Sequence, residues 1–192
     1  MLSIDELFTR YGTDKGSLGG AGWGYHTYYE KLMGPRRFDV KRVLEIGICG
    51  HRDIPNNVVG ASLFCWRDYF PNATIYGIDN DSRFVFNDQH RITTCLANAY
   101  SMAQMVEVME QLGGDFDMIV DDAVHDPVPQ IWLMNFLSSY LRKGGYYFME
   151  DVCPVKMVDG DVDRGLFDHI RGYEAILSLK TPKPEVLVVG IK

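Results

Sequence analysis

Residues 116–125 read FDMIVDDAVH, and this stretch decides the fold. Its first half is a short apolar run of the length and composition typical of a strand buried in a parallel sheet. The run ends in two carboxylates, Asp121 and Asp122, and His125 follows three residues after the second. Because ligands of open α/β sheets bind outside the carboxyl ends of the strands, we expect these side chains at a functional site.

A second stretch repeats this pattern. The apolar run YYFM at residues 146–149 is followed at once by Glu150 and Asp151. If the two strands are neighbours, up to four carboxylates come close together, where they repel one another and raise one another's pKa. A cation would relieve this repulsion, and oxygen ligands favour a hard ion such as Mg²⁺. The alternative is that single acids cap helices, as Asp126 before a proline is expected to do.

The rest of the chain alternates between strand and helix patterns. Residues 173–179 and 185–191 read as two strands joined by a loop too short for a parallel crossover, so they are expected to form an antiparallel hairpin. The pattern predicts a doubly wound α/β fold with a Rossmann-like sheet, mostly parallel with a C-terminal antiparallel hairpin. The terminal antiparallel pair is the feature that separates a class I methyltransferase sheet from an ordinary dinucleotide-binding one. Other strands are expected at residues 43–46, 74–78, 92–96 and 146–149, and helices at residues 4–11, 25–33, 62–70, 102–112 and 129–141.

Length and composition limit the protein class. The 192 residues suit a single domain, 1–192, with an N-terminal helical lid segment at 1–40 and a ligand-binding core at 41–192. We expect a cytoplasmic protein without membrane contact, because the sequence has neither a signal peptide nor an apolar run of about 18 residues. The net charge of −7 argues against a nucleic-acid partner. Reduced thiols are expected at the four widely spaced cysteines, Cys49, Cys65, Cys95 and Cys153.

A glycine-containing loop follows the first strand of this core. Glu45 and Gly47 open the sequence EIGICG, and glycines there let the backbone approach a ligand closely. Asp79 ends the next strand, where an acid can accept hydrogen bonds from ribose hydroxyls. A dinucleotide site needs the pattern G-x-G-x-x-G with its acid about 20 residues on, which this chain does not match. The helix expected from Ser62 also starts too late to hold a pyrophosphate. A nucleoside without phosphates fits better, and S-adenosylmethionine is the common one.

Several segments together resemble one enzyme family. They are YGTDK at 11–15, Tyr25, Tyr29 with Glu30, VLEIGI at 43–48, GASL at 60–63, Trp66, YFP at 69–71, IYGID at 75–79, 116–125 and 150–151. In order and spacing they resemble the magnesium-dependent sugar O-methyltransferases of macrolide and related antibiotic pathways, of the mycinamicin and demethylmacrocin type. The family usually has glycine at the position of Ala123, aspartate at Asn98 and histidine at Trp23, and its mycinamicin-type member has a large extra N-terminal domain.

The resemblance implies roles for individual residues. Asp122, Glu150 and Asp151 would bind Mg²⁺, and His125 would act as the general base beside Asp122. The segment that contains Thr13 would lie near the site. The cofactor S-adenosylmethionine is expected to contact Thr13, Tyr25, Glu45, Gly47, Asp79, Asn98 and Asp121.

These expectations define a reaction. An O-methyltransferase would move a methyl group from S-adenosylmethionine to a hydroxyl of a sugar or glycosylated natural product. Mg²⁺ would favour deprotonation of this hydroxyl, and His125 would remove the proton. Two alternatives stay open: a methyltransferase for a catechol or other small diol, and a non-catalytic S-adenosylmethionine-binding protein. Little of the chain is left to cover a substrate, which favours an open site or one completed by a neighbouring subunit of a homo-oligomer.

Overall fold

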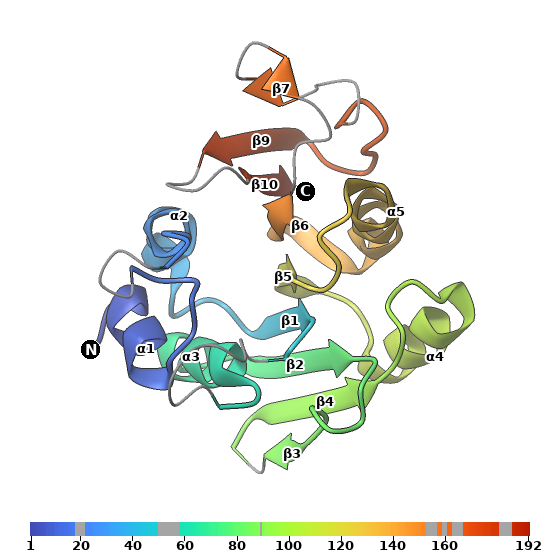
Figure 1. Cartoon of the computed structure of the whole chain (residues 1–192). Coiled ribbons are helices and arrows are strands. Elements are labelled where there is room, and N and C mark those ends of the chain that lie inside the picture. Colours follow the sequence, from blue (N-terminus) through green and yellow to red (C-terminus); the bar gives the residue numbers. More distant parts are fainter. Residues whose placement is uncertain are drawn as a thin grey trace.

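The computed structural model describes residues 1–17, 22–49, 58–88, 90–152, 157–158, 161–162, 167–180 and 186–192. In this part of the chain one eight-stranded sheet is covered on both faces by α-helices (Figure 1). Its strands are β1 (Arg42–Ile46), β2 (Thr74–Asp79), β3 (Asn87–Asp88), β4 (Ile92–Leu96), β5 (Phe116–Asp121), β6 (Leu141–Val152), β9 (Ala175–Lys180) and β10 (Val186–Ile191). The α-helices are α1 (Ile4–Tyr11), α2 (His26–Met33), α3 (Ala61–Tyr69), α4 (Met102–Leu112) and α5 (Pro127–Leu137).

Short elements complete the architecture. Two 3₁₀ helices, η2 (Gly34–Arg36) and η3 (Ser138–Tyr140), follow α2 and α5 directly. A separate two-stranded sheet pairs β7 (Met157–Val158) with β8 (Asp161–Val162). The sequence patterns did not predict β3, β7 or β8, because two residues are too few to show a periodicity.

The strand order in the large sheet is β3-β4-β2-β1-β5-β6-β10-β9. Strands β4, β2, β1, β5 and β6 run parallel, so their carboxyl ends meet at one edge. Strand β10 is antiparallel to both β6 and β9, which confirms the expected C-terminal hairpin. The predicted fold class is therefore confirmed. The chain order reverses at β1, and this is the place where open α/β sheets bind their ligands.

Two hydrophobic cores lie on opposite faces of the sheet. Val43 of β1 packs with α1, α2 and α3, whereas its neighbour Leu44 packs with α4 and α5. This alternation follows from the two-residue period of a strand. Figure 1 shows the same division, with α1–α3 on one side of the sheet and α4 and α5 on the other.

The helix starts follow from local chemistry. Ser3 and Glu6 form a capping box at the start of α1, and the Asp126 side chain accepts a hydrogen bond from Val128 N at the start of α5. The helix expected from Ser62 begins one residue earlier, at Ala61. The cap is Gly60, with a left-handed φ of 71°, and Ser62 is buried inside the helix. A Cβ at Gly60 would lie 2.6 Å from the Phe86 ring, which explains the choice of glycine.

Some residues of the chain lie outside the described part: 18–21, 50–57, 89, 153–156, 159–160, 163–166 and 181–185. They include Cys153, where a reduced thiol is expected, and the loop of the predicted hairpin. Among the helices that the structure does describe, none combines the length and the apolar composition that crossing a membrane requires.

Candidate functional site

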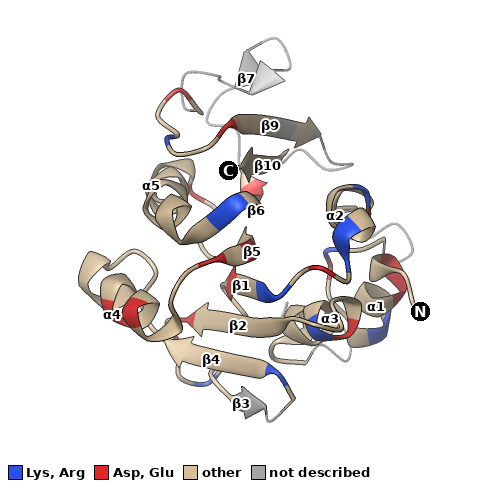
Figure 2. Ribbon diagram, turned by 180° about the vertical axis from the view of Figure 1, so that it is seen from behind, with Lys and Arg blue, Asp and Glu red and all other residues tan. Residues whose placement is uncertain are grey.

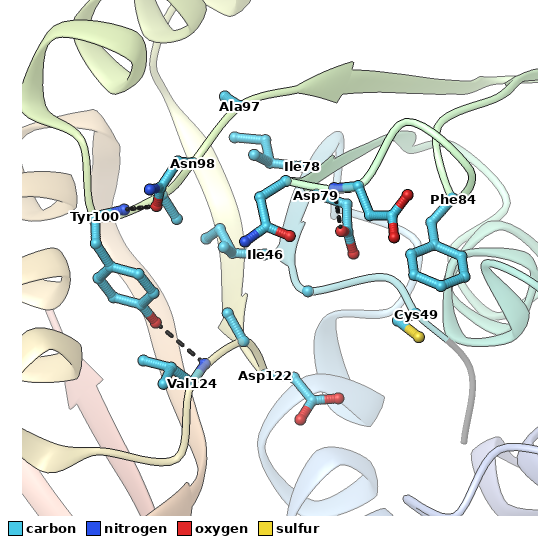
Figure 3. Close-up of a pocket in the computed structure, with 15 residues that line it drawn as sticks. Ile46, Cys49, Ile78, Asp79, Phe84, Ala97, Asn98, Tyr100, Asp122 and Val124 are labelled. Atoms are coloured by element: carbon cyan, nitrogen blue, oxygen red, sulfur yellow. Dashed lines mark hydrogen bonds between the residues drawn. The ribbon is translucent and has the colours of Figure 1, made fainter. Parts of the chain in front are cut away.

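A cavity of about 520 Å³ opens where β1, β2, β4 and β5 end (Figure 3). Three of the predicted cofactor residues line it: Gly47, Asp79 and Asn98. Asp122 lines it as well, so the predicted catalytic acid faces the same space. Its described lining contains three aspartates and neither lysine nor arginine, a composition that suits a neutral or cationic ligand better than a phosphate.

Gly47 brings two loops into backbone contact beneath the cavity. It has a φ of 83°, and a Cβ there would lie 2.2 Å from the carbonyl oxygen of Asp122. Asp122 N donates a hydrogen bond of 2.9 Å to Ile46 O, which ties the end of β5 to the end of β1. Only glycine fits this position, so the loop motif in the sequence has a steric reason here.

Asp79 and Asn98 are held rigidly at the cavity rim. The Asp79 carboxylate accepts hydrogen bonds from Ile48 N at 3.0 Å and Asp81 N at 2.9 Å. The Asn98 side chain accepts from Tyr100 N at 3.0 Å, and the Tyr100 hydroxyl in turn accepts from Val124 N at 3.2 Å (Figure 3). Sequence reasoning missed Tyr100, because nothing in its neighbourhood marks a residue that bridges two loops.

Beside the cavity, two acids and a histidine form a cluster. His125 Nε2 lies 3.6 Å from Asp122 Oδ1 and 3.4 Å from Asp151 Oδ2. One ligand atom from each of these three residues lies within 4.8 Å of the others, close enough to hold one metal ion. Since Asp122 belongs to both the cavity and the cluster, a group bound in the cavity lies next to the acids.

A β-bulge in β6 turns the side chains of two consecutive acids, Glu150 and Asp151, toward the α2 segment. Met149 pairs with Val188 and Val152 with Val186, so Glu150 and Asp151 together face a single residue of β10. Asp151 has a φ of 50°, which non-glycine residues rarely adopt. Without the bulge, the two side chains would point to opposite faces of the sheet. The sequence gives no sign of this irregularity.

Two tyrosines of the α2 segment donate hydrogen bonds to these two acids. The Tyr25 hydroxyl, at the start of the helix, donates to Asp151 Oδ1, and Asp151 N donates back to that hydroxyl at 3.1 Å. One turn later, the Tyr29 hydroxyl donates to Glu150 Oε1 at 2.5 Å. Tyr25 thus supports an acid and does not line the cavity. The four-residue spacing of two tyrosines on one helix face could have revealed Tyr29.

Lys15 is the central cation of the site. Its ammonium lies 2.6 Å from Asp122 Oδ2 and 3.4 Å from Glu45 Oε1, and it also contacts Glu150 Oε2. Its side chain is only 3% exposed. Both Glu150 oxygens are therefore engaged, one by Lys15 and one by Tyr29. Of the three predicted metal ligands, the structure brings Asp122 and Asp151 together with His125 and turns Glu150 toward Lys15.

Three further predicted cofactor residues do not line the cavity. Glu45 is fully buried and accepts a hydrogen bond from Trp66 Nε1 at 2.8 Å. Asp121 is fully buried and accepts from the Tyr147 hydroxyl at 3.2 Å. Thr13 accepts from Lys15 N at 3.3 Å and so shapes the turn that carries the lysine. Glu45 and Thr13 instead contact Lys15, and Asp121 accepts a hydrogen bond from Ala123 N, a residue of the cavity lining.

Burial and neighbouring charges shift the pKa values of the site residues in different directions. Burial opposes ionisation of Asp122, but Lys15 and His125 outweigh it and hold the pKa of this carboxyl below its usual range. Burial, together with the charge of Asp122, raises the pKa of Asp151 to about 6. The contact with Asp122 raises the pKa of His125, so its imidazole is a stronger base than that of free histidine. Burial raises the pKa of Asp121 to about 7.

Comparisons with known proteins place the chain in a family. No protein-family model matches the sequence. An L-olivosyl-oleandolide 3-O-methyltransferase of Streptomyces antibioticus is 30% identical over 89% of this chain and 46% of its own length. The demethylmacrocin O-methyltransferase of Streptomyces fradiae is 30% identical over 86% of this chain and 40% of its own. The chain thus spans less than half the length of either relative.

A solved structure extends the comparison. The MycE methyltransferase of mycinamycin biosynthesis, in complex with Mg, SAH and mycinamycin VI, superimposes with a TM-score of 0.72 at 26% identity. The match covers 99% of this chain and 54% of MycE. Fold and cavity together define a class I methyltransferase domain of the Rossmann-like type. Within that class, the chain is a relative of the sugar O-methyltransferases of antibiotic biosynthesis, as the sequence resemblance predicted.

Proposed function

We propose that the chain carries an S-adenosylmethionine-dependent O-methyltransferase activity toward a hydroxyl of a sugar or glycosylated natural product. We further propose that it works in the cytoplasm on a small molecule, in keeping with its net charge of −7. One observation carries the proposal: Asp122 lines the cofactor-sized cavity and also belongs to the acid–histidine cluster. A methyl donor and a hydroxyl acceptor would then meet at this residue.

The cavity fits S-adenosylmethionine by its chemistry. When bound, this cofactor supplies a methyl group on a positively charged sulfonium. Asp79 stands where an acid accepts hydrogen bonds from ribose hydroxyls, and the tight loop at Gly47 lets the ligand lie against the backbone. The aspartates of the lining favour a cation over a phosphate-bearing nucleotide. The relative MycE, which has been solved with SAH, supports the same assignment.

The cluster fits a divalent cation by its donor set. Asp122 and Asp151 offer carboxylate oxygens to one point, and Mg²⁺ prefers oxygen ligands. We assign these two acids to the metal and keep Glu150 as the third ligand that the family resemblance implies. When bound, Mg²⁺ supplies positive charge that lowers the pKa of a nearby acceptor hydroxyl. The complex of MycE with Mg supports this choice of ion.

His125 is the proposed general base. Its side chain is 47% exposed, so an acceptor can reach the imidazole from solvent. Its Nε2 would take the hydroxyl proton, and the carboxylates of Asp122 and Asp151, 3.6 Å and 3.4 Å away, would stabilise the resulting imidazolium. Positioning of the methyl donor in line with the acceptor oxygen supplies much of the remaining rate enhancement.

The proposal is tested by binding and by an acceptor screen. Calorimetry should show that SAH binds the protein, and mass spectrometry should show a methyl-group mass increase on a glycosylated macrolide when Mg²⁺ is present. Methylation of catechols alone would assign the enzyme to the other diol class. Absence of any methylated product, with SAH binding intact, would leave a non-catalytic binding protein.

A single substitution then tests the metal site. Asp151→Asn removes one charged oxygen ligand and should abolish Mg²⁺-dependent turnover, while SAH affinity stays within about twofold because Asp151 does not line the cavity. The control is Asp39→Asn, an exposed acid that precedes β1. Full activity of the wild-type protein in EDTA would show that these acids are structural.

A further inference from the structure

Lys15 occupies a position for which a metal ion would also compete. We infer that its ammonium group is the internal counter-ion of Asp122 and Glu150, and that a divalent cation which takes Glu150 as a ligand displaces it. The inference rests on the proposed metal site, and it assigns a role to a residue outside the expected ligand set.

The contacts of the ammonium carry the first step. A lysine ammonium has three N–H donors, and three carboxylates surround this one: Glu45, Asp122 and Glu150. The side chains of Lys15, Glu45 and Glu150 are each at most 3% exposed, so water contributes little to solvating these charges. A buried acid pair without a nearby cation would be costly, so Lys15 stabilises these acids in the metal-free protein.

The second step is that each oxygen of the buried Glu150 carboxylate already has a partner. Its Oε1 accepts the hydrogen bond from Tyr29, and its Oε2 contacts Lys15. A cation that coordinates Glu150 must therefore take the place of one of these two partners or crowd it. Two positive charges that share one carboxylate would also repel each other.

The third step decides which partner yields. The Tyr29 ring is fully buried, with ring centroids 4.8 Å from Trp66 and 4.5 Å from Phe148, so its hydroxyl cannot withdraw without unpacking the core. Lys15 instead lies between α1 and α2, outside any helix or strand. Its ammonium is carried on a flexible four-carbon side chain, which can change its conformation without moving a helix or strand. The ammonium is therefore the group that a metal ion displaces.

A thermodynamic cycle makes this testable without measuring turnover. Lys15→Met keeps the length of the side chain and removes the charge. If Lys15 pairs with the acids only in the metal-free protein, its ammonium competes with the metal ion. The variant should then bind Mg²⁺ about tenfold more tightly than the wild-type protein. In EDTA its melting temperature should fall below that of the wild-type protein, and saturating Mg²⁺ should largely close this gap.

The matched control is Lys31→Met, which removes the same charge from an exposed position on α2. It corrects for the change in net charge, and its Mg²⁺ affinity should equal that of the wild-type protein. Calorimetry with MgCl₂ and thermal unfolding in EDTA or MgCl₂ give both readouts. If Lys15→Met does not fold in EDTA, Lys15→Gln keeps a hydrogen-bond donor without the charge and is subject to the same two comparisons.

Three results would overturn the inference. Mg²⁺ affinity of the Lys15 variant no higher than that of the Lys31 variant would mean that the ammonium does not compete. Equal destabilisation with and without Mg²⁺ would mean that Lys15 keeps its carboxylates in the metal-loaded protein. Failure of the wild-type protein to bind Mg²⁺ at all would remove the proposed metal site and the inference with it.

Discussion

Asp122 uses its two oxygens for two different neighbours. Oδ2 contacts the Lys15 ammonium at 2.6 Å, while Oδ1 faces His125 Nε2 at 3.6 Å. The first contact keeps the carboxyl ionised in spite of burial, and the second orients the imidazole. A single residue thereby links the buried acids, the histidine and the cavity, which is why the opening stretch of the sequence marks the site.

At this scale we expect His125→Ala to lower kcat by about 10² to 10⁴, the usual range for a lost general base. SAH affinity should stay close to that of the wild-type protein, because His125 does not line the cavity. The loss should shrink as the pH rises, since hydroxide can replace the missing base. Steady-state rates over a pH series measure this, and a variant with the wild-type kcat throughout would remove His125 from the mechanism.

Asp79→Ala should weaken binding of S-adenosylmethionine by about 1–3 kcal/mol, the range for hydrogen bonds to a charged group. The carboxylate loses its expected ribose contacts and also releases Ile48 N and Asp81 N, which it now holds. Calorimetry with SAH gives the affinity, and circular dichroism checks the fold. Unchanged affinity in a folded variant would contradict the ribose assignment.

At the scale of elements, the sequence predicted regular segments well and irregular ones poorly. The position of the apolar residues in the sequence correctly predicted β1, β2, β4, β5 and the two strands of the terminal hairpin. Strand β6 begins at Leu141, before the position expected for it, because the glycines at 144 and 145 are part of the strand. The bulge at Glu150 and Asp151 was not predictable, since it depends on pairing with β10, a strand far along the chain.

The same limit applies to the site. Lys15 meets Asp122 and Glu150 across separations of 107 and 135 residues. No local pattern encodes such contacts, because tertiary packing creates them. The acids themselves were predictable, since the ends of parallel strands share one edge of the sheet. Sequence reasoning could therefore locate the site, but it could not show that Glu45, Asp121, Thr13 and Tyr25 lie outside the cavity lining.

The loop between β1 and α3 allows a prediction at the element scale. Gly47→Ala should destabilise the protein and abolish cofactor binding, because the new Cβ would lie 2.2 Å from a backbone oxygen that cannot move freely. Gly144→Ala is the matched control: its φ of 72° is equally left-handed, but nothing lies within 4 Å of the added carbon. The control should lose only about 1 kcal/mol of unfolding free energy.

Denaturant titration measures both glycine variants. The difference between them isolates the close approach of the two loops from the backbone strain that both share. Equal losses of unfolding free energy would show that the contact between Gly47 and Asp122 relaxes easily. The statement that only glycine fits at position 47 would then be wrong.

At the scale of the whole molecule, several acids gather near the carboxyl ends of the parallel strands, with Lys15 as their counter-ion. Near the carboxyl ends of β1, β2, β5 and β6 lie the acids Glu45, Asp79, Asp122 and Glu150. Figure 2 shows the acids of the chain in red and its lysines and arginines in blue. Three arginines, Arg42, Arg91 and Arg142, stand where β1, β4 and β6 begin, and Arg142 pairs there with Asp117 at the start of β5. The cavity thus opens at the acidic end of a molecule whose net charge is −7. Such a field attracts cations to the site.

This polarity predicts how salt affects the two forms of the cofactor. S-adenosylmethionine carries a sulfonium charge that S-adenosylhomocysteine lacks, and both present the same nucleoside to the cavity. Raising NaCl from about 0.05 M to 0.5 M should therefore weaken binding of the methylated form about threefold more than that of the neutral product.

Asp81→Asn, which removes a carboxylate from the cavity lining, should reduce this difference, whereas Asp39→Asn at the opposite end should leave it unchanged. Calorimetry of both ligands at each salt concentration measures the effect. Parallel salt dependence of the two ligands would mean that the acidic edge of the sheet does not act on the sulfonium, and shape alone would then select the cofactor.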